Sequence, residues 1–111
     1  MKWIPLITSD QLDTISQKSN NTPQVIFKHS TRCSISSMAL NRLERESAPD
    51  QADFYFLDLI QNRALSNEVA EKFEVHHESP QILLIKNRAC VYDESHQGIS
   101  MQEIAEQLIA N

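Results

Sequence analysis

The chain has 111 residues, of which 41% are hydrophobic and 23% are charged, and its net charge at pH 7 is −5. This length predicts one domain built around a single core. The acidic balance, with a sequence pI near 5.2, argues against nucleic acid or an anionic membrane surface as a partner. There is no apolar run of membrane-spanning length and no apolar signal-peptide block, so we expect a cytoplasmic protein.

The cysteine and glycine content excludes several classes of site. Cys33 and Cys90 are far apart and form neither a CxxC pair nor a zinc-binding spacing. A structural disulfide between them would be unusual in a reducing cytoplasm. Gly98 is the one glycine, so P-loop and Rossmann phosphate sites are excluded. The adjacent His76 and His77 lack further ligands, and we expect no metal.

The first half of the chain alternates strand and helix patterns. Thr8 with Gln11 predicts a capping box at a helix start. Ile35, Met38, Ala39, Leu40 and Leu43 recur at helical spacing and predict a buried helix face. The expected elements are a strand near 3–5, a helix over 9–18, a strand over 24–29, and a helix that follows Cys33 and ends near Ser47.

The second half continues the alternation and closes with a hairpin and a helix. Ser100 with Glu103 predicts a capping box for the last helix. The expected elements are a strand over 53–59, a helix over 64–73, a connector over 75–79, a strand that Pro80 opens with its body at 82–85, a turn at 86–88, a strand over 89–93, and a helix carrying Met101, Ile104 and Leu108. The order β-α-β-α-β-α-β-β-α predicts one α/β domain over residues 1–111.

The stretch Val25–Ser36 (VIFKHSTRCSIS) contains the candidate reactive group. Cys33 follows a buried strand and precedes a helix, beside unpaired backbone N–H groups and the positive end of the helix dipole. Such a position favours thiolate and lowers a cysteine pKa from its free value of roughly 8.5. The chemistry indicated is thiol–disulfide exchange. The competing interpretation is a buried cysteine that packs as a small hydrophobe.

Several segments resemble a known family. KHSTRCSIS (28–36), NRALSNEVAEKF (62–73), HESPQILLI (77–85) and ESHQGIS (94–100) are similar to the YtxJ-like proteins, the monothiol bacilliredoxins. The element order is that of thioredoxin. The resemblance implies a thioredoxin-like domain with a mixed central sheet flanked by helices. It also implies bacillithiol as co-substrate, no tightly bound cofactor, S-bacillithiolated proteins as clients, and an external thiol or redoxin as reductant.

The motif around the cysteine departs from the family at one position. The family has Thr-Cys-Pro-Ile-Ser, and this chain has Arg32-Cys33-Ser34-Ile35-Ser36. Ser34 leaves the nucleophile in place and adds a hydroxyl near the sulfur. Ser36 stands where a CxxC oxidoreductase has its resolving cysteine, so a mixed disulfide at Cys33 needs an outside thiol. The Ser36 hydroxyl is either a donor to the thiolate or an ordinary polar group of the first helical turn.

Two further segments are expected to flank Cys33. Ser79–Pro80 matches the thioredoxin cis-proline that faces the active cysteine, and the Ser79 backbone would pair with a client chain. From there the strand leads away, and Cys90 should lie ~16–20 Å from the active-site end, too far for a disulfide. The returning strand should bring Glu94, Ser95, His96 and Gly98 back near Cys33.

Four basic or ionisable residues are candidate thiol or client contacts. Lys28 and Arg32 either bind the carboxylates of bacillithiol or form a solvated positive pair. His29 is a candidate for electrostatic stabilisation of the thiolate when it is charged. His96 is either a contact at the rim or an ordinary loop residue.

The function that these residues and the resemblance favour is that of a monothiol thiol–disulfide oxidoreductase that removes bacillithiol from protein mixed disulfides through Cys33. One alternative is a thioredoxin-fold binding module without turnover. Another is iron–sulfur handling, as in monothiol glutaredoxins with Cys-Gly-Phe-Ser, which the Ser34-Ile35 pair disfavours.

Overall fold

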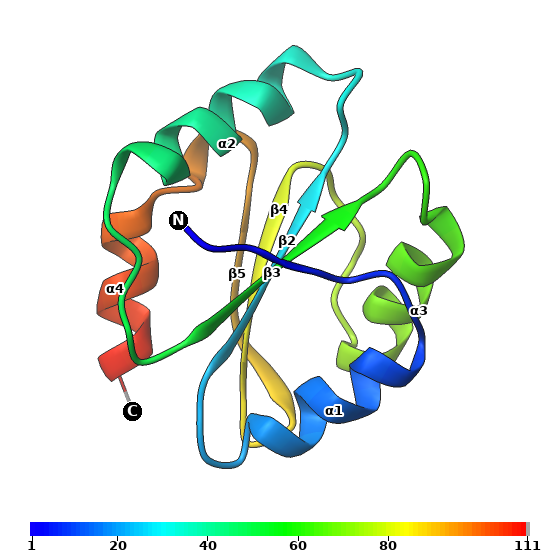
Figure 1. The fold of residues 1–111 in the computed structure, drawn as a ribbon, viewed down its shortest axis with the longest axis vertical. Helices are drawn as coiled ribbons and strands as arrows, with labels where there is room; N and C mark the ends of the chain where they lie inside the picture. Colours follow the sequence, from blue (N-terminus) through cyan, green and yellow to red (C-terminus); the bar gives the residue numbers. More distant parts are fainter. Residues whose placement is uncertain (111) are drawn as a thin grey trace.

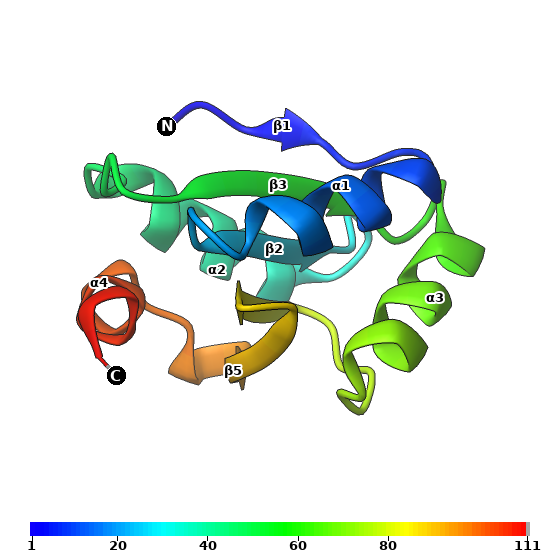
Figure 2. The ribbon, with the colours of Figure 1, turned by 90° about the horizontal axis from the view of Figure 1, so that it is seen from below.

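The computed structural model describes residues 1–110 and is built around strand β2 (Gln24–His29), whose six residues are all buried. The expected domain of residues 1–111 extends one residue beyond the described part. The sheet order is β1-β3-β2-β4-β5 (Figure 2). The other strands are β1 (Ile4–Pro5), β3 (Asp53–Asp58), β4 (Gln81–Lys86) and β5 (Ala89–Ser95).

The sheet is mixed, as the resemblance implies. β3 runs parallel to both β1 and β2, whereas β4 runs antiparallel to β2 and to β5. Because β2 and β3 are parallel, their carboxyl ends meet at one edge, where the Leu59 N–H donates to the His29 carbonyl at 2.8 Å. The chain segments after these two strands therefore begin side by side.

Helices cover both faces of the sheet (Figure 1). The helices α1 (Asp10–Lys18) and α3 (Arg63–Phe73) lie on one face, and α2 (Ser34–Arg45) and α4 (Met101–Ile109) on the other. A short 3₁₀ helix, η1 (His96–Gly98), joins β5 to α4. None of the helices within residues 1–110 is both long and apolar enough to cross a membrane.

Alternating strand residues divide the core into two clusters, one for each face. Ile26, Leu83 and Ile85 belong to the cluster that includes residues of α1 and α3. Val25 and Leu84, on the opposite face, belong to the cluster that includes residues of α2 and α4. Side chains of a strand alternate between faces, so β2 and β4 stabilise both layers with continuous apolar runs.

The two predicted capping boxes differ in outcome. Ser100 caps α4, and its Oγ accepts from the Glu103 N–H at 3.2 Å, as predicted. The first box is formed in part, because Oε1 of Gln11 accepts from the Thr8 N–H at 3.0 Å, as a capping box requires, and also from the Ile7 N–H. The other half is missing, because α1 begins at Asp10 after Ser9 and the Thr8 hydroxyl donates to the same Oε1 at 3.4 Å.

The remaining differences lie at element ends. β5 extends to Ser95, two positions beyond the expected 93, and α2 ends at Arg45 before the expected Ser47. Ile35 and Met38, expected on the buried face of α2, are 41% and 58% exposed. The first turn of α2, which includes Ile35, lies beyond the end of the sheet (Figure 1).

Candidate functional site

Cys33 occupies the N-cap position of α2. Its backbone is extended, with φ −111° and ψ 119°, and its N–H donates to the Ser30 carbonyl at 3.1 Å. The first helical bond runs from the Ser37 N–H to the Cys33 carbonyl at 3.1 Å. The N–H groups of residues 34–36 therefore lack helical acceptors and stand beside Cys33, which is half-buried and free. The predicted strand-to-helix position of this thiol is confirmed.

Ser36 serves neither of the two roles considered for it. Its side chain is fully buried, and its Oγ accepts from the Ser30 N–H at 3.0 Å. The same oxygen lies 2.7 Å from Nδ1 of His29. The hydroxyl thus joins the end of β2 to the first turn of α2, and its hydrogen bonds go to these partners and not to the Cys33 sulfur. It fixes the loop that carries the thiol.

His29 is a buried, neutral side chain and not a cation beside the thiolate. It is 4% exposed, and its ring packs against Phe56 and Phe27 at centroid distances of 5.3 and 5.8 Å. Burial lowers the pKa of His29 below its ordinary value, and Asp58 and Glu44 only partly oppose this. The expectation that a charged His29 stabilises the thiolate is therefore wrong at neutral pH.

Lys28 is neither a solvated residue nor a surface contact. Its side chain is fully buried on the α3 face of the sheet, where Nζ donates to the Ser66 carbonyl at 3.2 Å and lies 3.2 Å from Nδ1 of His77. Burial lowers the pKa of Lys28 to about 8. Both readings of Lys28 as an exposed charge are wrong, because the alternation of β2 directs it under α3. Arg32 is exposed in the loop before Cys33, and its contact with bacillithiol stays a prediction.

The Ser79–Pro80 peptide bond is cis, as predicted. Pro80 is buried immediately before β4, and its carbonyl accepts from the His96 N–H at 3.1 Å. The register of the hairpin places Ser95 opposite Gln81. The end of β5 and η1 thus return to the start of β4, which brings the predicted residues Glu94, Ser95 and His96 beside the proline.

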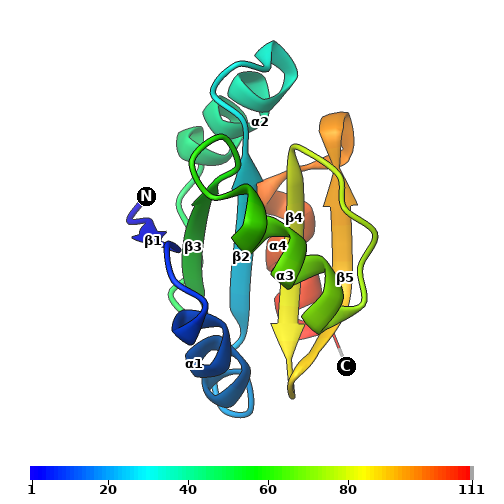
Figure 3. The same ribbon diagram turned by 90° about the vertical axis from the view of Figure 1, so that its right-hand side faces the viewer.

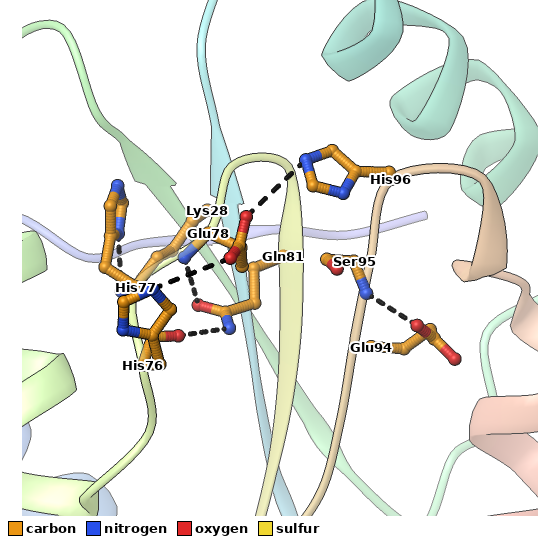
Figure 4. A network of polar contacts seen from close by, with 8 residues as sticks. All are labelled: Lys28, His76, His77, Glu78, Gln81, Glu94, Ser95 and His96. Atoms are coloured by element: carbon orange, nitrogen blue, oxygen red, sulfur yellow. Dashed lines mark hydrogen bonds and ion pairs between the residues drawn. The ribbon is translucent and has the colours of Figure 1, made fainter.

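His96 links three segments of the chain. It is exposed, and its Nε2 lies 3.8 Å from Oε1 of Glu78, whose Oε2 lies 3.7 Å from Nε2 of His76 (Figure 4). Arg42 of α2 donates to the His96 carbonyl at 3.0 Å and to the Ile99 carbonyl at 3.1 Å. The 3₁₀ turn is thereby bonded to the proline loop and to the helix of Cys33, and a client contact by the His96 ring stays a prediction.

Cys90 lies at the opposite end of the β4–β5 hairpin from Ser95. It pairs in register with Ile85, and both cysteines are free. Its Sγ lies 3.3 Å from the Tyr92 carbonyl, and it packs against the core cluster of the α1 and α3 face. Burial raises the pKa of the Cys90 thiol to about 11. This environment is that of a packing residue, and its place in the hairpin agrees with the prediction that Cys90 lies away from the active-site end.

Sequence reasoning missed the polar partners that hold the proline loop from inside. Gln81 donates through Nε2 to the His76 carbonyl at 2.9 Å, and its Oε1 accepts from the Glu78 N–H at 3.4 Å. The Ser66 carbonyl and Nδ1 of His77 are the hydrogen-bond partners of the Lys28 ammonium group. One signal was present, because a lysine two positions after Ile26 in an otherwise apolar strand must share the face of that isoleucine. No group of three or more His, Cys, Asp or Glu side chains within residues 1–110 is arranged to hold a metal ion.

Comparison with known proteins agrees with this geometry. Residues 4–104 match the family model described as monothiol bacilliredoxin BrxC. The chain belongs to the monothiol bacilliredoxin family. A solved structure described as an oxidoreductase with a thioredoxin fold is 31% identical to this bacilliredoxin, with a TM-score of 0.77 over 93% of this chain and 90% of the other.

Structures of more distant proteins support the fold assignment and nothing beyond it. The thioredoxin of Malassezia sympodialis is 19% identical, with a TM-score of 0.76 over 98% of this chain and 92% of the other. Schistosoma mansoni thioredoxin is 20% identical, with a TM-score of 0.70 over 96% and 93%. The predicted thioredoxin fold is confirmed, and family and fold together identify a monothiol redox protein.

Proposed function

We propose that this bacilliredoxin removes bacillithiol from mixed disulfides on client proteins in a reducing cytoplasm, with Cys33 as the nucleophile. The observation that carries the proposal is the N-cap position of Cys33, beside three unpaired N–H groups and with Ser36 in place of a second thiol. Partial positive charge at a helix N-terminus stabilises an anion such as a thiolate.

The proposed reaction has two balanced steps. The Cys33 thiolate attacks the bacillithiol sulfur of the client disulfide, an S–S bond forms between Cys33 and bacillithiol, and the client leaves as a thiolate. A second thiolate then attacks this mixed disulfide and restores Cys33, while bacillithiol leaves in a new disulfide with the attacking thiol. That second thiol must come from outside the chain, because Ser36 cannot form a disulfide and Cys90 lies at the far end of the hairpin.

A bacillithiolated client provides the direct test. The reduced protein is mixed with a folded client that carries one bacillithiol disulfide, and intact mass is followed for both proteins. We expect the client to lose the mass of bacillithiol and Cys33 to gain it. Cys33→Ala should abolish the transfer, and the matched variant Cys90→Ala should retain it. Transfer that continues unchanged in Cys33→Ala refutes the proposal.

The same experiment separates the oxidoreductase from a binding module. A module without turnover would bind the client and leave the client disulfide intact in every variant. Binding is measured in parallel on the client in its reduced form, so the loss of mass and the formation of a complex are scored independently.

A further inference from the structure

The loop between α3 and β4, residues 74–80, is held by buried side chains although it lacks regular structure. We call this segment the prolyl loop, since it ends at Ser79–Pro80. Gln81 holds it through the His76 carbonyl and the Glu78 N–H. Lys28 holds it through His77, and α3 covers this region of β2 and β4 (Figures 3 and 4). Side chains of β2 and β4 therefore hold the prolyl loop in position.

The chemistry of the Lys28–His77 contact determines which group donates. A lysine ammonium has three N–H donors and no acceptor, so Nδ1 of His77, 3.2 Å away, must supply the lone pair. The imidazole is then neutral and carries its proton on Nε2. The Ser66 carbonyl takes a second ammonium proton at 3.2 Å. The contact between the Lys28 and His77 side chains is therefore a hydrogen bond only while His77 remains neutral.

We propose that Lys28 and His77 form a positioning pair that holds the prolyl loop in its client-binding position, and that protonation of His77 releases the loop. The inference rests on the proposed function of Cys33, because it assigns the loop beside Ser79–Pro80 to client binding. Lys28 contacts no substrate. It acts through His77 on the backbone segment that a client chain would pair with.

The charges around His77 support a release on acidification. Lys28 of β2, Arg63 of α3 and His76 of the loop present positive charge to the imidazole, and Glu78 presents negative charge. Burial, followed by Lys28 and Arg63, lowers the pKa of His77 below its ordinary value. Burial lowers the pKa of Lys28 to about 8, so at pH 7 the lysine is the charged donor. Protonation of Nδ1 on acidification converts this hydrogen bond into a repulsion between two cations.

The first test compares transfer with intrinsic thiol reactivity. The rate of bacillithiol transfer from a protein client is divided by the rate of Cys33 alkylation with iodoacetamide, measured at the same pH. We expect Lys28→Met and His77→Leu to lower this ratio roughly 10- to 100-fold at pH 7.5, the scale of a misplaced binding element. His77→Asn keeps an acceptor near Nδ1 without an ionisable ring. Its ratio should stay near wild type and change less than that of wild type between pH 7.5 and 5.5.

The second test measures the loop itself and does not depend on activity. Hydrogen exchange at the Glu78 amide, which donates to Gln81, should be faster in Lys28→Met and His77→Leu than in wild type or His77→Asn. Wild-type exchange together with a wild-type rate ratio in Lys28→Met overturns the inference. A wild-type protein that transfers no bacillithiol refutes the proposed function instead, and the exchange rates still decide whether the pair holds the loop.

Discussion

The Ser36 hydroxyl lies 2.7 Å from Nδ1 of His29, and both side chains are buried. The contact joins the last residue of β2 to the first turn of α2, on either side of the loop that carries Cys33. A serine at this position therefore has a structural use that a second thiol would not reproduce, because sulfur is larger and a weaker hydrogen-bonding group. The hydrogen bond that holds the loop of Cys33 therefore requires a serine at the position where a second thiol would stand.

Removal of the Ser36 hydroxyl should destabilise the fold. Ser36→Ala leaves the buried His29 ring nitrogen and the Ser30 N–H without their partner, at a cost of about 1–3 kcal/mol. Urea denaturation at pH 7 measures the change. Ser37→Ala, at the exposed neighbouring position, is the matched control and should alter stability by less than about 0.5 kcal/mol. Equal stabilities of the two variants would contradict the role of the Ser36–His29 contact.

Stability should decrease as the pH falls below the ordinary histidine value. Burial holds the pKa of His29 below 6.5 in the folded protein, so the unfolded chain binds more protons in the window between the two pKa values. The free energy of unfolding therefore falls as the pH decreases through that window. Urea midpoints at pH 7.5 and 5.5 test this, and His29→Gln should reduce the difference. A slope that His29→Gln leaves unchanged would exclude His29 as its source.

Proline should be tolerated at position 34. Ser34 is the first residue of α2, where the N–H has no helical acceptor, and Cys33 before it is extended, as a residue before proline must be. Ser34→Pro should leave the free energy of unfolding unchanged or raise it by about 0.4–1 kcal/mol. Ile35→Pro is the control and should lower the melting temperature, because the preceding Ser34 is helical. A lower melting temperature for Ser34→Pro would contradict this reading of the N-cap.

The two cysteines should differ in reactivity. Burial raises the pKa of the Cys90 thiol to about 11, whereas Cys33 is at a helix N-terminus. Native protein treated briefly with iodoacetamide at pH 7.5 should gain one adduct, and peptide mass spectrometry should locate it at Cys33. Cys33→Ser should remain unmodified until it is denatured. Comparable labelling of Cys90 in the native state would contradict the assignment.

The sequence predicted the elements and the position of Cys33 at the start of a helix because those signals are local. The apolar run of β2, the capping box at Ser100 and the helical spacing after Cys33 depend on neighbours in the chain. Lys28, His29 and Ser36 were misread because their partners come from other layers. Lys28 is buried because α3 packs over it, and His29 is buried because the ring of Phe56 packs against it. The local sequence of β2 contains no signal for either contact.

The strict alternation of β2 also limits how this gene product can change in length. Lys28 and His29 are adjacent, and they point to opposite layers: one supports the prolyl loop and the other supports the loop of Cys33. A deletion or insertion of one residue in β2 before Lys28 would exchange their faces, and would turn the other side chains on the same side of the change toward the wrong layer. Substitutions at Lys28 and at His29 can change the two contacts separately, but the number of residues in β2 cannot change without moving both side chains.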